Sequence, residues 1–125
     1  MSEAVREAAI AAARLGGGVY FVRALKAKRI KIGFAASPLA RMLSLFTGSP
    51  ETYQLAAVIP GDRKIEAYMH DWFKGSRAKG EWFDESSILL DFISSASSNP
   101  MLDFKEWRWL RDMENVVPIE RDKNN

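Results

Sequence analysis

Cysteine is absent from the 125 residues of this chain, and histidine occurs once, at His70. Without cysteine there is no disulfide, no thiolate nucleophile and no metal site with cysteine ligands. A single histidine excludes zinc sites and nuclease sites that take several histidines from one chain. The absence of cysteine also suits a reducing compartment, and we expect a cytoplasmic location.

Long apolar runs are lacking as well. No run of apolar residues reaches the length that a membrane-spanning helix needs. The alanine-rich beginning of the chain has some likeness to a signal peptide, but Arg6, Glu7 and Arg14 interrupt it. We therefore expect neither a membrane span nor a cleaved leader.

Acidic residues are missing from one long stretch. Residues 8–50 contain seven of the 18 basic residues and no Asp or Glu, so all 16 acidic residues lie in the rest of the chain. The net charge of +2 hides this asymmetry. A basic region beside an acidic one is what a polyanion-binding surface near a metal-binding carboxylate requires, although a plain solvated surface has the same composition.

The apolar content of 47% is enough for one core, and the order of local signals indicates an α+β fold. We expect helices at 2–15, from Ser37 onward, at 62–74, at 86–93 and at 103–114, and strands at 19–24, 29–34 and 52–59. The helix after Ser37 is expected to bury Leu39, Met42, Leu43 and Phe46. The prediction is a three-stranded sheet, a hairpin plus one strand, antiparallel or mixed and flanked by helices.

The hairpin is the best defined part of this prediction. Strands 19–24 and 29–34 flank a basic turn, and alternate residues of a strand share a face. Tyr20 is therefore expected on the face opposite to Val19 and Phe21. Lys31 and Gly33 are expected on the face opposite to Ile30 and Ile32.

Several short motifs follow one another on these elements. Gly-Val-Tyr ends at Tyr20, Lys-Ile-Gly begins at Lys31, and Arg41 lies eight residues after the second motif. Glu66 and His70 lie four apart on the helix at 62–74, and Gly-Glu-Trp-Phe follows at 80–83. Each motif alone is a weak signal, but their order and their placement on the expected elements make the combination specific.

In this combination the chain resembles the GIY-YIG nuclease superfamily, and within it a branch common in phage and prophage proteins. The resemblance covers roughly residues 18–84. With the flanking helices, which lie outside the resemblance, we expect three parts: 1–17 (a helix), 18–95 (a GIY-YIG-like nuclease domain) and 96–125 (a helical extension with a disordered tail). Lys31 stands where the second tripeptide of the family has tyrosine, which leaves the role of that position open.

The resemblance also implies roles for individual residues. Glu66 would hold one Mg²⁺ or Mn²⁺ ion, and Arg41 would clamp the scissile phosphate with its planar fork. Tyr20 would orient or deprotonate the attacking water. Lys31 would replace a tyrosine hydrogen bond to water or phosphate, or lower the pKa of Tyr20 by proximity.

Other positions keep more than one interpretation. His70 is expected as a general base, an orienting group, a DNA contact or a structural residue, and Glu81 as a second metal ligand or a partner of nearby cations. The aromatic residues Trp82 and Phe83 are expected in the core. Phosphate contacts or ordinary surface charges are expected at Lys26, Lys28, Arg29, Arg77 and Lys79.

The function that these residues predict is metal-dependent cleavage of DNA. The first alternative is a DNA-binding or assembly module that keeps the fold without cleavage. A second alternative is a protein-interaction domain, with a homodimer formed through the C-terminal helix at 103–114.

Overall fold

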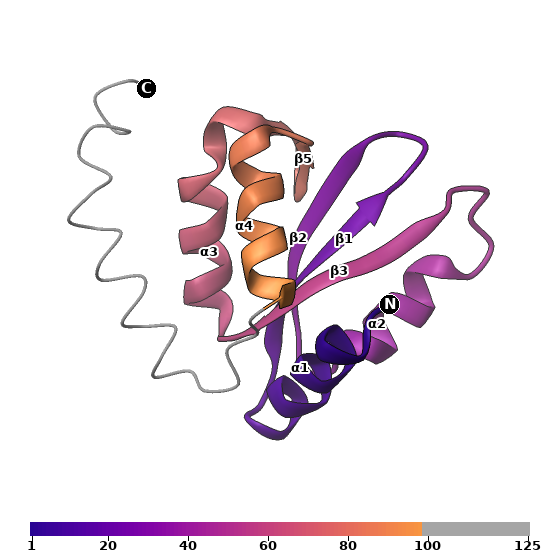
Figure 1. The fold of residues 1–125 in the computed structure, drawn as a ribbon, viewed down its shortest axis with the longest axis vertical. Coiled ribbons are helices and arrows are strands. Elements are labelled where there is room, and N and C mark those ends of the chain that lie inside the picture. The colour runs from indigo at the N-terminus through magenta and orange to yellow at the C-terminus, as the bar shows by residue number, and fades with distance from the viewer. Residues whose placement is uncertain (99–125) are drawn as a thin grey trace.

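A computed structural model describes residues 1–98, in which strands and helices follow one another as Figure 1 shows. Their bounds are α1 Glu3–Arg14, β1 Gly18–Ala24, β2 Arg29–Ala35, α2 Pro38–Phe46, β3 Tyr53–Pro60, α3 Arg63–Trp72, the 3₁₀ helix η1 Lys74–Ser76, β4 Arg77–Lys79, β5 Trp82–Asp84 and α4 Ser87–Ser98. The expected helix at 103–114 lies outside the described residues. None of the described helices combines the length and apolar composition that crossing a bilayer requires.

The α+β class is confirmed, but the sheet in residues 1–98 has five strands and not three. The strand order is β3-β1-β2-β5-β4, and every neighbouring pair is antiparallel. The two strands missing from the prediction, β4 and β5, have three residues each. Strands this short show no alternation of apolar and polar residues, so they read as a loop and a short extended piece.

Helices cover both faces of this sheet. Figure 1 shows α3 and α4 on one side of the strands and α1 and α2 on the other. One core cluster joins the inner side of α3 and α4 to Phe21, Ile30 and Ile32, and a second joins α1 and α2 to Tyr20 and Val22. Alternate residues of β1 therefore enter different cores, as the hairpin pattern predicts.

The register of the hairpin determines which side chains meet. Tyr20 pairs with Gly33 and Val22 pairs with Lys31. These four residues share the face that α2 covers, and Lys31 in turn pairs with Trp82 of β5. The face under α2 consequently carries the tyrosine and the lysine that the sequence singles out.

Local signals set the start of α2, which covers this face, and the start of α3, on the other side of the sheet. Ser37 accepts a hydrogen bond from the backbone nitrogen of Ala40, with Pro38 in the first turn, and Asp62 accepts two backbone hydrogen bonds at the start of α3. The expected buried stripe of α2 is wrong at one position, because the side chain of Leu43 is 65% exposed while Met42 is buried.

Candidate active site

Tyr20 lies at the centre of the candidate site. Its side chain is only 1% exposed, and its ring lies against Gly33 on the neighbouring strand. A Cβ atom at position 33 would lie 2.6 Å from Cζ of the tyrosine, so only glycine leaves room for this ring. Within residues 1–98 the Tyr20 hydroxyl has no hydrogen bond of good geometry, although the guanidinium of Arg41 lies near enough to act on it as a donor.

Charged side chains from three other segments surround this hydroxyl. Burial raises the pKa of the Tyr20 phenol above its ordinary value of 10.0, and the carboxylate of Glu81 raises it further. The guanidinium of Arg41, on α2, acts in the opposite direction, and Glu66, on α3, adds a smaller upward effect on the pKa. The fold therefore brings Tyr20, Arg41, Glu66 and Glu81 to one place.

Lys31 faces Glu81 rather than the phenol. Its Nζ lies 3.8 Å from Oε1 of Glu81, and the Glu81 carbonyl accepts a hydrogen bond of 2.9 Å from the backbone of Ile32. Of the two roles considered for Lys31, a lowering of the pKa of Tyr20 finds no support, because Lys31 is not among the groups that shift this pKa and the net shift is upward. Glu81 keeps its two interpretations, a second metal ligand or a partner of nearby cations; the cation beside it is Lys31 and not Arg77 or Lys79.

Glu66 and His70 project from α3 toward β2. The Nε2 atom of His70 lies 2.7 Å from the carbonyl oxygen of Ile32. A carbonyl only accepts hydrogen bonds, so Nε2 carries the proton and donates it. The imidazole also meets the ring of Phe83 edge-on at 5.1 Å. His70 thus fastens α3 to β2 one helical turn from Glu66.

The carboxylate of Glu66 has one oxygen, Oε2, that is buried without a hydrogen-bond partner. Residues 1–98 contain no group of three or more histidine, aspartate and glutamate side chains arranged to hold a metal ion. A hard cation such as Mg²⁺ is commonly held by one or two carboxylates and several waters. The unpaired oxygen of Glu66, with few other acidic side chains near it, fits such an ion. It does not fit a zinc site, because zinc needs three or four protein ligands.

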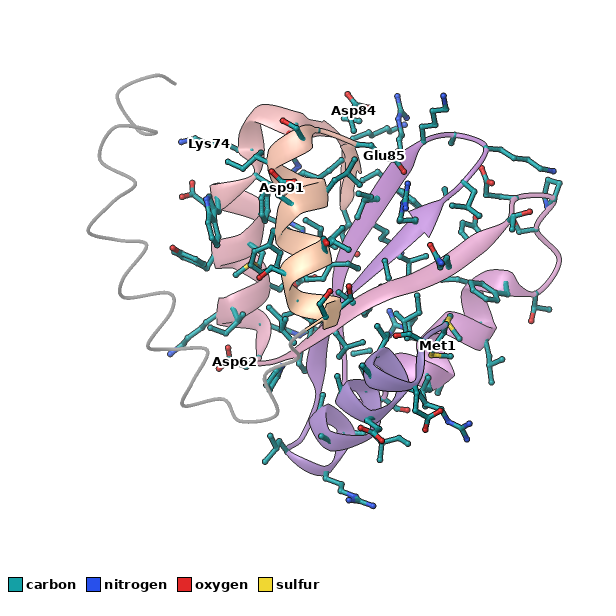
Figure 2. All side chains as sticks on the ribbon, viewed as in Figure 1. Met1, Asp62, Lys74, Asp84, Glu85 and Asp91 are labelled. Carbon is teal, nitrogen blue, oxygen red and sulfur yellow. The ribbon has the colours of Figure 1, made fainter. Side chains whose placement is uncertain are left out.

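The five basic residues expected at phosphates lie in the hairpin turn, at the start of β2 and in β4, and none of them is among the charges that shift the pKa of Tyr20. Lys26 donates to the carbonyl of Pro50, Arg29 lies 3.3 Å from Asp84, and Arg77 donates to the carbonyl of Gly80. Figure 2 shows Asp84 beside the hairpin end of the sheet. Lys28 and Lys79 are exposed. These residues form a periphery and not a part of the central cluster.

Two features of the site were not expected from the sequence. One is the contact of Gly33 with the tyrosine, which the pairing of two adjacent motifs on one hairpin would have indicated. The other concerns Trp82. It was expected in the core together with Phe83, yet only Phe83 is buried, and Trp82 is partly exposed beside Lys31.

Comparison of the chain with models of protein families, with curated proteins and with solved structures finds no match.

Proposed function

We propose that the chain is a metal-dependent endonuclease that hydrolyses DNA phosphodiester bonds at a single-metal site of the GIY-YIG type. The observation that carries this proposal is a pair of buried oxygens: the Tyr20 hydroxyl, which interacts with the Arg41 guanidinium, and Oε2 of Glu66, which has no hydrogen-bond partner. Leaving one buried polar atom unpaired costs about 1–3 kcal/mol. The two groups are close enough for Glu66 to affect the pKa of Tyr20, and a water and a cation would satisfy both.

Glu66 is the proposed ligand of Mg²⁺ or Mn²⁺, with Glu81 as the candidate for a second carboxylate. Such an ion supplies positive charge to the non-bridging phosphate oxygens and acidifies a bound water. His70 is proposed as a positioning residue, because its hydrogen bond to Ile32 holds the part of α3 that carries Glu66.

Arg41 and Lys31 are the proposed phosphate contacts. Arg41 is exposed, so its guanidinium is accessible to a phosphate from solvent, and its planar fork matches two phosphate oxygens. Lys31 is held loosely, at 3.8 Å from Glu81, and a phosphate oxygen would compete for its ammonium group.

Tyr20 is proposed to orient the attacking water and not to deprotonate it. Its raised pKa keeps the phenol neutral at physiological pH, and a neutral phenol both donates and accepts hydrogen bonds. The Arg41 guanidinium acts on this hydroxyl as a donor, and the hydroxyl can still donate its own proton to that water. This assignment chooses between the two roles that the resemblance leaves open.

The test is nicking of supercoiled plasmid in the presence of Mg²⁺ or Mn²⁺. Glu66→Gln and Arg41→Ala should abolish nicking, whereas Glu7→Gln and Arg6→Ala, at exposed positions of α1, should nick like the unaltered chain. Nicking that survives in the first two variants would contradict the proposal at these residues, and no nicking with either ion would refute the enzyme.

One observation favours the alternative of a DNA-binding or assembly module without cleavage. In residues 1–98 the lysine of the second motif is paired with a carboxylate and the tyrosine of the first has a raised pKa, so neither group is set up as a base. Binding that weakens steeply with salt while no DNA is cut would support this alternative.

The cellular setting and the assembly follow from the proposal. A DNA-cleaving chain of this kind would act in the cytoplasm, in a bacterium or from a phage. A homodimer through the C-terminal helix stays a prediction, since residues 103–114 lie outside the described part of the chain. Loss of dimerisation after truncation at Ser95 would support it.

A further inference from the structure

Three aromatic side chains lie in a row on the face of the sheet that α2 covers. Phe46, at the end of α2, stacks on Tyr53 of β3, with ring centroids 5.4 Å apart and planes within 14°. The ring of Tyr53 lies 6.4 Å from that of Trp82 on β5. The term aromatic row denotes these three residues, all of which are only partly buried.

The row reaches from β3 to β5 across the two strands that lie between them. Tyr53 pairs with Ala24 of β1, and Trp82 pairs with Lys31 of β2. Ala24 fills little of the space above the sheet, and a cavity of about 220 Å³ opens there. Its lining consists of Ala24, Ala27, Arg29, Glu51, Tyr53 and Trp82. Cavities for drug-sized ligands begin at about 300 Å³, so this one suits a single flat ring.

Positive charge borders the cavity. Arg29, which also forms an ion pair with Asp84, lines it, and the ammonium group of Lys31 lies 6.0 Å from the centroid of the Trp82 ring. The one carboxylate in the lining, Glu51, is engaged by the backbone nitrogens of Lys26, Ala27 and Thr52. These hydrogen bonds lower the pKa of Glu51, so it stays ionised as an anchor for the hairpin turn.

Lys31 connects the cavity with the candidate active site. The same ammonium group lies 3.8 Å from Glu81, whose carboxylate acts on Tyr20. A strand bound with one phosphate at Tyr20 and Arg41 would therefore pass Lys31 and reach the aromatic row with a neighbouring nucleotide.

We propose that the aromatic row binds one unstacked base of the DNA strand, next to the phosphate that the candidate active site would hold. The proposal rests on the proposed function and adds a substrate class to it, namely single-stranded or locally opened DNA. An aromatic face beside cations recognises a base and its phosphate together. Because Tyr53 and Trp82 are too close for a third ring to enter between them, the base stacks onto the row from the cavity.

The experiment measures binding of a short fluorescent oligothymidylate by anisotropy at fixed salt with EDTA present, so that no cleavage occurs. Trp82→Leu keeps an apolar side chain but removes the ring, and Trp82→Phe restores one. Stacking on one ring is worth about 1–3 kcal/mol per base, which corresponds to a loss of affinity between about 5-fold and about 150-fold. We expect that loss for Trp82→Leu and near-normal binding for Trp82→Phe.

An oligonucleotide with one abasic position makes the test specific for a base. For the unaltered chain the abasic strand should bind more weakly, whereas Trp82→Leu should bind the abasic and intact strands equally, because the partner of the base is already gone. A blunt duplex should be affected little by either substitution. Circular dichroism of each variant checks that the fold is kept, and Tyr53→Leu provides a second removal of a ring.

The outcomes separate this inference from the proposed function. The base site would be overturned, and the proposed nuclease left standing, if Trp82→Leu lost equal affinity for duplex and single-stranded DNA. The same holds if the abasic position had no effect on affinity. Ring-dependent binding in a chain that nicks no plasmid would support the base site and refute the enzyme. Absence of binding to every DNA probe would overturn both.

Discussion

The ring of Tyr20 and the backbone of Gly33 are in direct contact across the hairpin. A Cβ atom on Gly33 would lie 2.6 Å from Cζ of Tyr20 and 3.0 Å from Oε1 of Glu81. Both contacts are with side chains of the candidate site, and the tyrosine ring is enclosed by the core under α1 and α2. The glycine of the second motif thus leaves the space that the ring of the tyrosine of the first motif occupies.

Gly33→Ala is therefore expected to displace Tyr20 and to lower cleavage more than it lowers stability. Overpacking of this kind costs about 1–3 kcal/mol, which leaves most of a domain's stability in place. Plasmid nicking and urea unfolding measure the two effects. Gly75→Ala is the matched control, because its Cβ would meet no atom within 4 Å. Normal nicking by Gly33→Ala would show that the position of the tyrosine ring is unimportant.

Tyr20→Phe separates function from stability. The hydroxyl that is removed is buried and interacts with the guanidinium of Arg41, an exposed side chain, so the free energy of unfolding should change by no more than about 1 kcal/mol. Nicking should be lost, because the water then has no orienting group. Urea unfolding at neutral pH checks the first part. A large loss of stability would mean that the hydroxyl has a structural hydrogen bond, and the assignment to catalysis would fall.

The alkaline stability of the protein should depend on the same hydroxyl. The pKa of Tyr20 is raised in the folded chain, so the folded state holds this proton more tightly than the unfolded chain, whose tyrosine titrates near 10.0. The stability that this proton contributes is therefore fully present below pH 10.0, and it is lost as the pH rises through the raised pKa of the folded chain. When the pH is raised from neutral to above the pKa of tyrosine, the melting temperature should fall less for Tyr20→Phe than for the unaltered chain. Tyr53→Phe, which removes a hydroxyl bonded to Ser49, is the control.

How far the sequence predicted this site depends on the kind of signal. The faces of the hairpin were predictable because a period of two leaves one choice of face for Tyr20, Lys31 and Gly33. The starts of α2 and α3 were predictable from Ser37 and Asp62, whose side chains cap the helices. Glu66 and His70 share one side of α3 because four residues make about one turn.

Other parts could not be predicted, because they depend on pairing between distant segments. The strands β4 and β5 are too short to show an alternation of apolar and polar residues. Because they could not be recognised as strands, the pairing of Lys31 with Trp82 could not be predicted either. That pairing decides both the ion pair of Lys31 with Glu81 and the exposure of Trp82. The exposure of Leu43 depends on which side of α2 meets the sheet. The helical spacing of apolar residues fits both Met42 and Leu43 as buried positions, and only Met42 is buried.

His70 is expected to contribute mainly through its link between α3 and β2. His70→Phe keeps an aromatic ring beside Phe83 but removes the donor to the Ile32 carbonyl, which leaves that oxygen without its side-chain partner. We expect a loss of about 1–3 kcal/mol in the free energy of unfolding. Urea unfolding measures it. Unchanged stability together with abolished nicking would instead identify His70 as a base or a DNA contact.

Binding of the cation can be tested without any substrate. An ion that binds only the folded chain raises stability by about 2.7 kcal/mol at a hundredfold excess over its Kd. Mg²⁺ or Mn²⁺ should therefore raise the melting temperature of the unaltered chain and leave that of Glu66→Gln unchanged, since this variant keeps the shape of the side chain without its charge. Glu81→Gln decides the second ligand: a reduced shift assigns Glu81 to the ion, whereas a full shift leaves it as the partner of Lys31. Equal shifts in the unaltered chain and Glu66→Gln would place the ion elsewhere, because the partnerless oxygen of Glu66 is the group that favours this site.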